Sequence, residues 1–211
     1  DGMQMRLAAI LMTHRAIFEI MQLRANGPLE FQVYDSFEKV MDYFHTVISY
    51  FNSLKEVGKT ESQIQTYLLK EVRRVFNRVI RPQKLIHSLY TYSINKGELT
   101  GRLTGEEVKN ELERVSSSWK AQKRFASIGE AGNEVKSGTV PPDFIVATNM
   151  ISVGIDVSRF NSILINSMPR NIAEYIQASS RVGRDSSGIV INLLDANRSR
   201  EKSYFENYKT F

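Results

Sequence analysis

Three short apolar segments in the last third of the chain constrain its fold more than any other feature. Residues 143–150 read DFIVATNM, residues 162–168 read SILINSM, and residues 188–195 read GIVINLLD. Short, continuous apolar runs bounded by turn residues are typical of buried parallel strands. Residues 171–180, between the second and third segments, have room only for a compact crossover helix. The pattern therefore predicts a parallel sheet covered by helices, an α/β fold.

The front of the chain predicts helices and one further strand. Apolar residues at helical spacing predict a helix over 3–24. Residues 45–60, HTVISYFNSLKEVGKT, run from a β-branched and aromatic stretch into a turn, which is typical of a buried strand feeding a helix. A long helix is then predicted over 61–93, broken or kinked at Pro82.

A start signal at Thr104–Glu107 predicts another helix, to Arg114 or as far as Phe125. The Gly- and Pro-containing stretch 127–142 predicts a loop. We expect a helical extension at 1–45, followed by one α/β domain at 46–211. Because the sequence begins with aspartate rather than methionine, we also expect it to be a piece of a longer protein.

Composition excludes several classes of function. The chain has no cysteine, so disulfides, zinc ribbons and thiol nucleophiles are excluded, and a reducing cytoplasm is the expected location. No apolar run approaches the roughly 18 residues of a membrane-spanning helix, so no membrane partner is expected. His14, His45 and His87 are too widely spaced to predict a metal site. The formal charge of +5 weakly favours a polyanionic partner.

Cations gather on the face of the predicted 61–93 helix that lies opposite its apolar stripe. Glu71 is the single acid among six cations, which are Lys70, Arg73, Arg74, Arg78, Arg81 and Lys84. A solvated helix face and a phosphate-contacting face are equally consistent with this pattern. The two interpretations stay open at this point.

Two other features imitate ligand sites. Gly58-Lys59-Thr60 resembles the end of a phosphate-binding loop, but Ser53 stands where that loop needs a glycine, so we expect a helix surface or turn. Trp119 could stack on a base. Anchoring of a helix end is the favoured interpretation of this tryptophan.

Polar residues follow the predicted strands, and in a sheet of this kind ligands bind at the carboxyl ends of the strands. We expect three segments to converge there: ATNMISVGID (147–156), QASSRVGR (177–184) and the Asn52-Ser53 turn. Two arginines three residues apart suit a phosphate, because planar guanidinium groups bind phosphate oxygens bidentately. An ordinary surface pair is the alternative interpretation of Arg181 and Arg184.

These segments resemble motifs of superfamily 2 helicases. ATNMISVGID is similar to motif V and QASSRVGR to motif VI of the second, C-terminal RecA-like domain of that superfamily. SYFNSL, ELTGR and RSREKSYFENY are similar to segments of a subgroup of large bacterial helicases that includes the helicase of DISARM-type phage defence, although Glu201 stands where aspartate is expected. The resemblance covers residues 46–211, weakly over 61–140, and implies a three-layer α/β/α RecA-like fold.

The resemblance implies a role for each matching residue in an ATP-dependent helicase or translocase. Arg181 and Arg184 would be arginine fingers for the γ-phosphate of ATP, with Gln177 beside the same phosphate. Gly154 and Asp156 would contact the nucleotide, whose Mg²⁺ and phosphates would be held mainly by a first RecA-like domain in the same parent chain.

The resemblance also implies a nucleic-acid partner, with DNA the expected type. Four residues would contact the sugar-phosphate backbone of one strand: Ser53, Thr100, Arg102 and Thr148. Such contacts give affinity without reading sequence.

Alternatives from other classes remain. The chain has neither the Gly-rich phosphate loop nor the acidic magnesium motif of an ATPase, so we expect no activity from it alone. A non-catalytic nucleic-acid-binding or docking module with the same fold is the second hypothesis. A phosphate loop and acidic box upstream in the parent would favour the helicase. A small-molecule enzyme is disfavoured, because no Ser/His/Asp set or pair of carboxylates follows the predicted strands.

Overall fold

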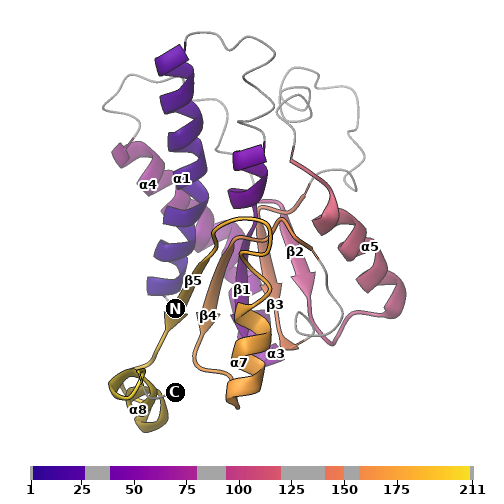
Figure 1. Cartoon of the computed structure of the whole chain (residues 1–211), viewed down its shortest axis with the longest axis vertical. Helices are drawn as coiled ribbons and strands as arrows, with labels where there is room; N and C mark the ends of the chain where they lie inside the picture. Colours follow the sequence, from indigo (N-terminus) through magenta and orange to yellow (C-terminus); the bar gives the residue numbers. More distant parts are fainter. Residues whose placement is uncertain (1, 27–38, 80–93, 120–140, 150–156, 210–211) are drawn as a thin grey trace.

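A parallel sheet forms the centre of the molecule (Figure 1). The computed structural model describes residues 2–26, 39–79, 94–119, 141–149 and 157–209. Within these residues there are five strands, all paired in parallel in the order β2-β3-β1-β4-β5. They are β1 (Val47–Phe51), β2 (Lys96–Leu99), β3 (Phe144–Ala147), β4 (Ser162–Asn166) and β5 (Ile189–Leu193). The three predicted strands of the last third are confirmed, as is the strand predicted after residue 45.

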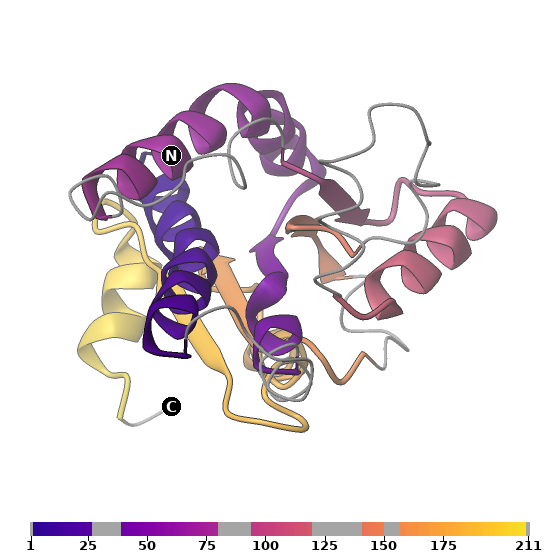
Figure 2. The ribbon, with the colours of Figure 1, turned by 90° about the horizontal axis from the view of Figure 1, so that it is seen from above.

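The central strand β1 is buried along its whole length. It pairs with β3 on one side and β4 on the other, so that Ile48 lies between Ile145 and Ile163. Successive side chains point to opposite faces of a sheet. Two separate buried clusters result, one on each face, and helices cover both. This three-layer α/β/α arrangement is the predicted one (Figure 2).

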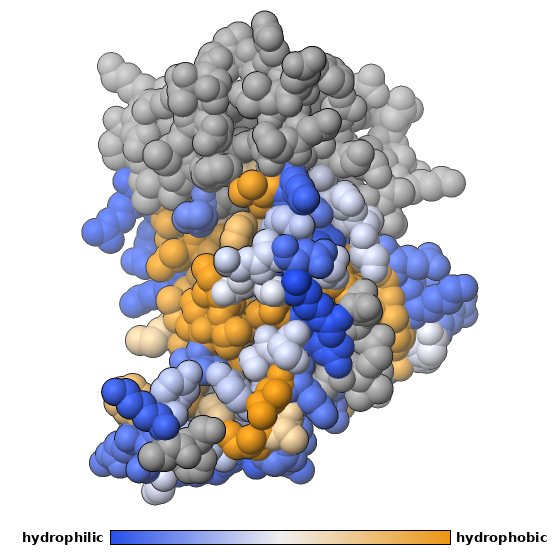
Figure 3. Space-filling model, in the orientation of Figure 1, coloured by the Kyte–Doolittle hydropathy of each residue, from blue (hydrophilic) through white to orange (hydrophobic). Residues whose placement is uncertain are grey.

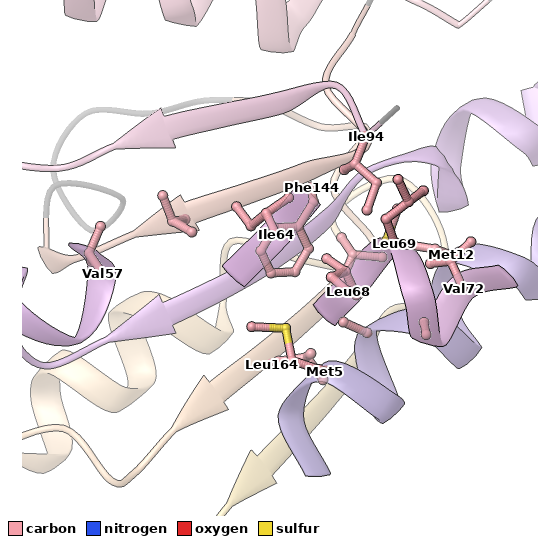
Figure 4. Packing of buried hydrophobic residues seen from close by; sticks show 14 of the residues in the cluster. Met5, Met12, Val57, Ile64, Leu68, Leu69, Val72, Ile94, Phe144 and Leu164 are labelled. Carbon is pink, nitrogen blue, oxygen red and sulfur yellow. The ribbon is translucent and has the colours of Figure 1, made fainter. Parts of the chain in front are cut away.

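One face is covered by α1 (Gly2–Asn26), α3 (Leu54–Gln63) and α4 (Leu69–Val79). Figure 4 shows residues of these helices beside Phe144 and Leu164 of the strands. Helix α1 contributes four residues at helical spacing, Met5, Ala8, Ala9 and Met12, none more than 4% exposed. The segment predicted as an extension therefore supplies part of this layer.

A π-helical turn, Ile64–Leu68, joins α3 to α4. The Leu69 N–H donates to the Ile64 carbonyl, five residues back, which identifies the wider turn. Buried residues recur at every fourth position here: Thr60, Ile64, Leu68, Val72 and Phe76. A regular α-helix has 3.6 residues per turn, so a four-residue spacing would drift around it. The wider turn keeps these side chains toward the sheet.

The other face is covered by α5 (Gly105–Ser116) and α7 (Ile172–Ser179), while α8 (Ser199–Glu206) follows β5. A capping box formed by Thr104 and Glu107 begins α5, as predicted. The Asn171 side chain accepts from the Glu174 N–H and caps α7, which confirms the predicted crossover helix. Glu201 in α8 is 3% exposed and its carboxylate accepts from the Asp195 N–H at 2.6 Å.

Several expectations need correction. The helix predicted to begin at 61 begins at Leu54, because the Ser53 hydroxyl caps it there; residues 80–93 lie outside the described part. Gly58-Lys59-Thr60 lies within this helix, which agrees with the expected helix surface rather than the expected turn.

Two strands also differ from expectation. Strand β2 was not predicted, since KGEL lacks an apolar run. Strand β5 is only half buried, because it forms an edge, and Figure 3 shows hydrophobic residues on the visible face over β4 and β5.

The predicted anchoring role of Trp119 is confirmed. Trp119 is 3% exposed, and its backbone N–H donates to Asp42 Oδ1 at 2.7 Å. The same carboxylate accepts from the buried Arg159 at 2.9 Å. The tryptophan therefore fixes the end of the α5 segment to the protein interior.

The predicted loop at 127–142 falls mostly outside the described residues. Among the helices of the part that is described, none combines the length and hydrophobicity needed to cross a bilayer.

Candidate functional site

The carboxyl edge of the sheet has a topological switch point between β1 and β4. Strand β1 continues into α3 on one face, whereas its neighbour β4 continues into α7 on the other. Ligands bind α/β sheets in the crevice at such a point. Asn52 spans it: Nδ2 donates to the carbonyls of Ser167 at 3.3 Å and Met168 at 3.1 Å.

A hollow of about 280 Å³ lies at this edge and brings two predicted nucleic-acid contacts together. Ser53 and Thr148 both line it, with Gly101 between Thr100 and Arg102 in the sequence. The Ser53 hydroxyl accepts from the Glu56 N–H at 3.4 Å and so also caps α3. Thr148 is 6% exposed, and its N–H donates to the Leu99 carbonyl at 3.1 Å.

Two residues of this hollow, Arg170 and Tyr50, were missed by sequence reasoning, whereas Asn52 belongs to the predicted Asn52-Ser53 turn. Arg170 is exposed at its rim. Tyr50 lines it, and burial together with the nearby Glu174 charge raises the pKa of the Tyr50 phenol. Asn52 Oδ1 is buried and has no hydrogen-bond partner among the described residues. The basic residue after Pro169, at the start of a predicted helix, was the available signal for Arg170.

A second hollow of about 480 Å³ adjoins the first, and Phe51 lines both. It lies toward β4 and β5 and includes Lys59, Asn166 and Arg198.

The other two predicted nucleic-acid contacts face carboxylates. Thr100 is fully buried and its hydroxyl donates to Glu98. Arg102 donates through Nε to Glu98 Oε1 at 2.5 Å and forms a second ion pair with Glu61. Sequence reasoning missed both pairings: Glu98 begins the ELTGR segment itself, and Glu61 lies 41 positions from Arg102, on α3.

These ion pairs shift the ionisation of their members. Burial opposes ionisation of Glu61, but hydrogen bonds from Lys96 and Arg102 outweigh it and lower the pKa of the Glu61 carboxyl. Hydrogen bonds to Glu98 and Glu61 raise the pKa of Arg102. Both shifts favour the charged forms of Glu61 and Arg102.

The arginine segment lies at the opposite edge of the sheet, which corrects the predicted convergence. The N–H of Gly183, between Arg181 and Arg184, donates to the Phe160 carbonyl at 3.0 Å and to Asn161 Oδ1 at 3.1 Å. Both partners precede β4, at the amino edge. The physical reason is that a crossover helix between parallel strands runs antiparallel to them and ends at their amino edge; Figure 1 shows α7 packed on the sheet.

The turn that holds the arginines is narrow. Gly183 has φ of +77°, and Gly188 comes so close that a Cβ on it would lie 2.8 Å from Gly183 N. Arg184 is exposed and Arg181 half-buried, and Gln177 is exposed on the last turn of α7. All three side chains therefore belong to one surface region at this edge.

Gly154 and Asp156, the predicted nucleotide contacts, lie outside the described residues. Val157, which follows them, is 7% exposed and belongs to the same buried cluster as Val182 in the arginine segment. Among the side chains that are described, no three His, Asp or Glu residues gather as metal ligands.

The basic face on α4 keeps both of its interpretations. Arg73, Arg74 and Arg78 are exposed on this helix, and Arg74 pairs with Glu71 at 2.7 Å. Arg81 and Lys84 lie outside the described residues.

The chain matches a known domain family over more than half of its length. Residues 68–186 match the family described as "Helicase conserved C-terminal domain". The chain is also 32% identical over 177 residues to the DISARM protein DrmA of Bacillus paralicheniformis. The matched region covers 84% of this chain but only 14% of that relative.

Solved structures of low sequence identity are also similar. The match to the helicase Lhr of Mycobacterium smegmatis, bound to ssDNA and AMP-PNP, covers 76% of this chain and 16% of the Lhr chain, with 15% identity and a TM-score of 0.34. The match to the C-terminal part of the Fun30 ATPase domain covers 90% of this chain and 53% of that structure's chain, with 13% identity and a TM-score of 0.42. The match to the Hef helicase domain of Pyrococcus furiosus covers 93% of this chain and 32% of the Hef chain, with 17% identity and a TM-score of 0.39.

Proposed function

The chain belongs to the helicase C-terminal domain family, and on this premise we propose that it is the second RecA-like lobe of an ATP-dependent nucleic-acid helicase or translocase. The observation that carries the proposal is the separation of two polar regions on one sheet. The arginine segment lies at the amino edge, and Ser53 and Thr148 lie at the carboxyl edge. A lobe with two such sites can couple events at one to movement at the other.

At the amino edge, Arg181 and Arg184 bind the γ-phosphate of an ATP held mainly by the first lobe. The turn at Gly183 is fixed by Asn161 and Phe160, so the arginines project from a rigid support. Arginine fingers contribute roughly 10³ to 10⁵ in rate in related phosphoryl transfers. Gln177 lies one helical turn earlier and orients the attacking water or the same phosphate.

The groups present suit the phosphates of ATP better than its metal. Two guanidinium groups complement spread negative charge. The Mg²⁺ that ATP brings would neutralise charge on its phosphates, and we assign its ligands to the first lobe. Gly154 and Asp156 contact the ribose in this proposal, as the resemblance implies.

At the carboxyl edge, the 280 Å³ hollow receives the backbone of one nucleic-acid strand, with DNA the expected type. The hydroxyls of Ser53 and Thr148 and the guanidinium of Arg170 contact phosphates there. Asn52 Oδ1 offers a buried acceptor that lacks a partner within the described residues. Thr100 and Arg102 join these contacts only when released from Glu98.

The test uses Arg184→Ala in a longer protein that contains both lobes. We expect loss of nucleic-acid-stimulated ATPase activity, at least about 10³-fold, with unchanged affinity for single-stranded DNA. Lys109→Ala, on the exposed face of α5, removes the same charge and serves as the control.

Retained turnover in Arg184→Ala would remove the finger role. A longer protein that binds DNA but hydrolyses no ATP, even without substitutions, would favour the binding-module alternative instead.

A further inference from the structure

Arg102 is held by two carboxylates from separate elements. Its Nε donates to Glu98 Oε1 at 2.5 Å, and a terminal nitrogen donates to Glu98 Oε2 at 2.7 Å. The same terminal nitrogen contacts Glu61 on α3. The Arg102 side chain is 39% exposed, against 16% for each acid, so the pairs form at the surface rather than in the core.

The geometry of these pairs is that of a phosphate contact. The two parallel bonds from one guanidinium to one carboxylate use the nitrogens that would bind two phosphate oxygens. The Thr100 hydroxyl donates to the same Glu98 carboxylate. The two predicted nucleic-acid contacts in ELTGR, Thr100 and Arg102, therefore both donate to Glu98. This carboxylate lies beside the hollow that Gly101 lines.

We propose that Glu98 and Glu61 form an acidic clamp on Arg102 that competes with nucleic-acid phosphate. This inference rests on the proposed function of the carboxyl edge. A strand binds there by displacing a pair that already exists, so the clamp lowers affinity. Lys96 Nζ lies 2.8 Å from Glu61 Oε1, so Glu61 keeps a cationic partner when Arg102 turns to a phosphate. The clamp thus favours release of the strand.

The test measures binding of the 211-residue chain to a fluorescein-labelled oligothymidine strand by anisotropy, over a series of salt concentrations. Four variants are compared with the unmodified chain: Glu98→Gln, Glu61→Gln, Arg102→Ala and the double variant Glu98→Gln/Arg102→Ala. Glu113→Gln, on exposed α5, changes the net charge equally and is the matched control. Thermal unfolding of each variant checks that it is folded.

Glu98→Gln should bind about 5- to 10-fold more tightly, with a salt slope steeper by about 0.7, the value of one added phosphate contact on a single strand. Glu61→Gln should show a smaller gain of the same sign, and Glu113→Gln a change below about twofold. The gain should vanish in the double variant, because it needs Arg102.

Equal or weaker binding by Glu98→Gln and Glu61→Gln, or a gain that persists without Arg102, overturns the clamp and leaves the proposed binding edge intact. If neither the unmodified chain nor any variant binds the strand, the proposed nucleic-acid contact at this edge fails, and the clamp fails with it.

Discussion

At the scale of single residues, the arginine segment depends on two glycines that approach each other. Gly183 has φ of +77°, a region that residues with a Cβ rarely adopt. A Cβ on Gly183 would also lie 3.1 Å from Gly188 N. The positions of Arg181 and Arg184 therefore depend on glycine, which has no Cβ, at both 183 and 188.

Gly183→Ala should lower the free energy of unfolding by about 1–2 kcal/mol, the usual cost of the left-handed conformation. The contact with Gly188 adds to this cost. Urea unfolding of the chain measures the change. Gly58→Ala is the control: a Cβ there meets no atom within 4 Å, and the position is helical. It should stabilise the chain by about 0.5–1 kcal/mol. Equal effects of the two substitutions would contradict the turn described here.

At the scale of elements, the sequence predicted what local patterns determine. The apolar runs of β1, β3 and β4 and the capping box of α5 are local signals, and each element formed where it was predicted. Strand β2 escaped prediction because an edge strand needs few apolar residues, and Gly97 and Glu98 contribute none. The π-turn also has no local signal, since it depends on which side chains meet the sheet.

The site was only partly predictable, because some of its residues meet through the fold and not through local sequence patterns. Ser53 and Thr148 follow strands whose carboxyl ends share an edge, so their meeting in one hollow follows from the topology. The arginines were predicted at the wrong edge, because the crossover helix that carries them runs antiparallel to the strands and ends at their amino edge. Pairing of Arg102 with Glu61 joins residues 41 positions apart, which no spacing rule reveals.

Glu61 links α3 to β2, and its contribution to stability should depend on pH. Its ordinary pKa is 4.5, and Lys96 and Arg102 lower the folded-state value despite the opposing effect of burial. A lowered carboxyl pKa stabilises the fold fully above the ordinary value, and this stabilisation is lost as pH falls through the folded value. Glu61→Gln should therefore destabilise the chain at neutral pH and lose that deficit progressively below about pH 4.5.

Urea unfolding at a series of pH values measures the difference between the two chains, with Glu113→Gln as the control on exposed α5. A deficit that is constant with pH would mean that charge on Glu61 does not hold these elements together.

At the scale of the whole molecule, α1 completes one of the two helical layers. It packs against α4 and β4 in the same cluster as the central strand. The family match begins only at residue 68, yet the core on this face includes residues from 5 onward. The predicted boundary after residue 45 stays a prediction, but the helix before it contributes to the core of the sheet domain.

Met5→Ala should lower the free energy of unfolding by about 2–4 kcal/mol, since it removes buried methylene groups and leaves a cavity. Met3→Ala is the matched control on the same helix turn, because Met3 is 68% exposed whereas Met5 is 3% exposed. The control should change stability by less than about 0.5 kcal/mol. Chemical denaturation distinguishes the two, and equally small effects would mean that α1 is a dispensable appendage.

The wide turn at Ile64–Leu68 holds one residue more than a regular helical turn. Each residue advances a helix by about 100°. Deleting one residue inside this turn would close it into a regular α-helix and leave Val72 and Phe76 toward the sheet, whereas a deletion within α4 would rotate the residues that follow it. Related chains should therefore tolerate the loss of one codon in this short stretch, with the remainder of α4 keeping its orientation.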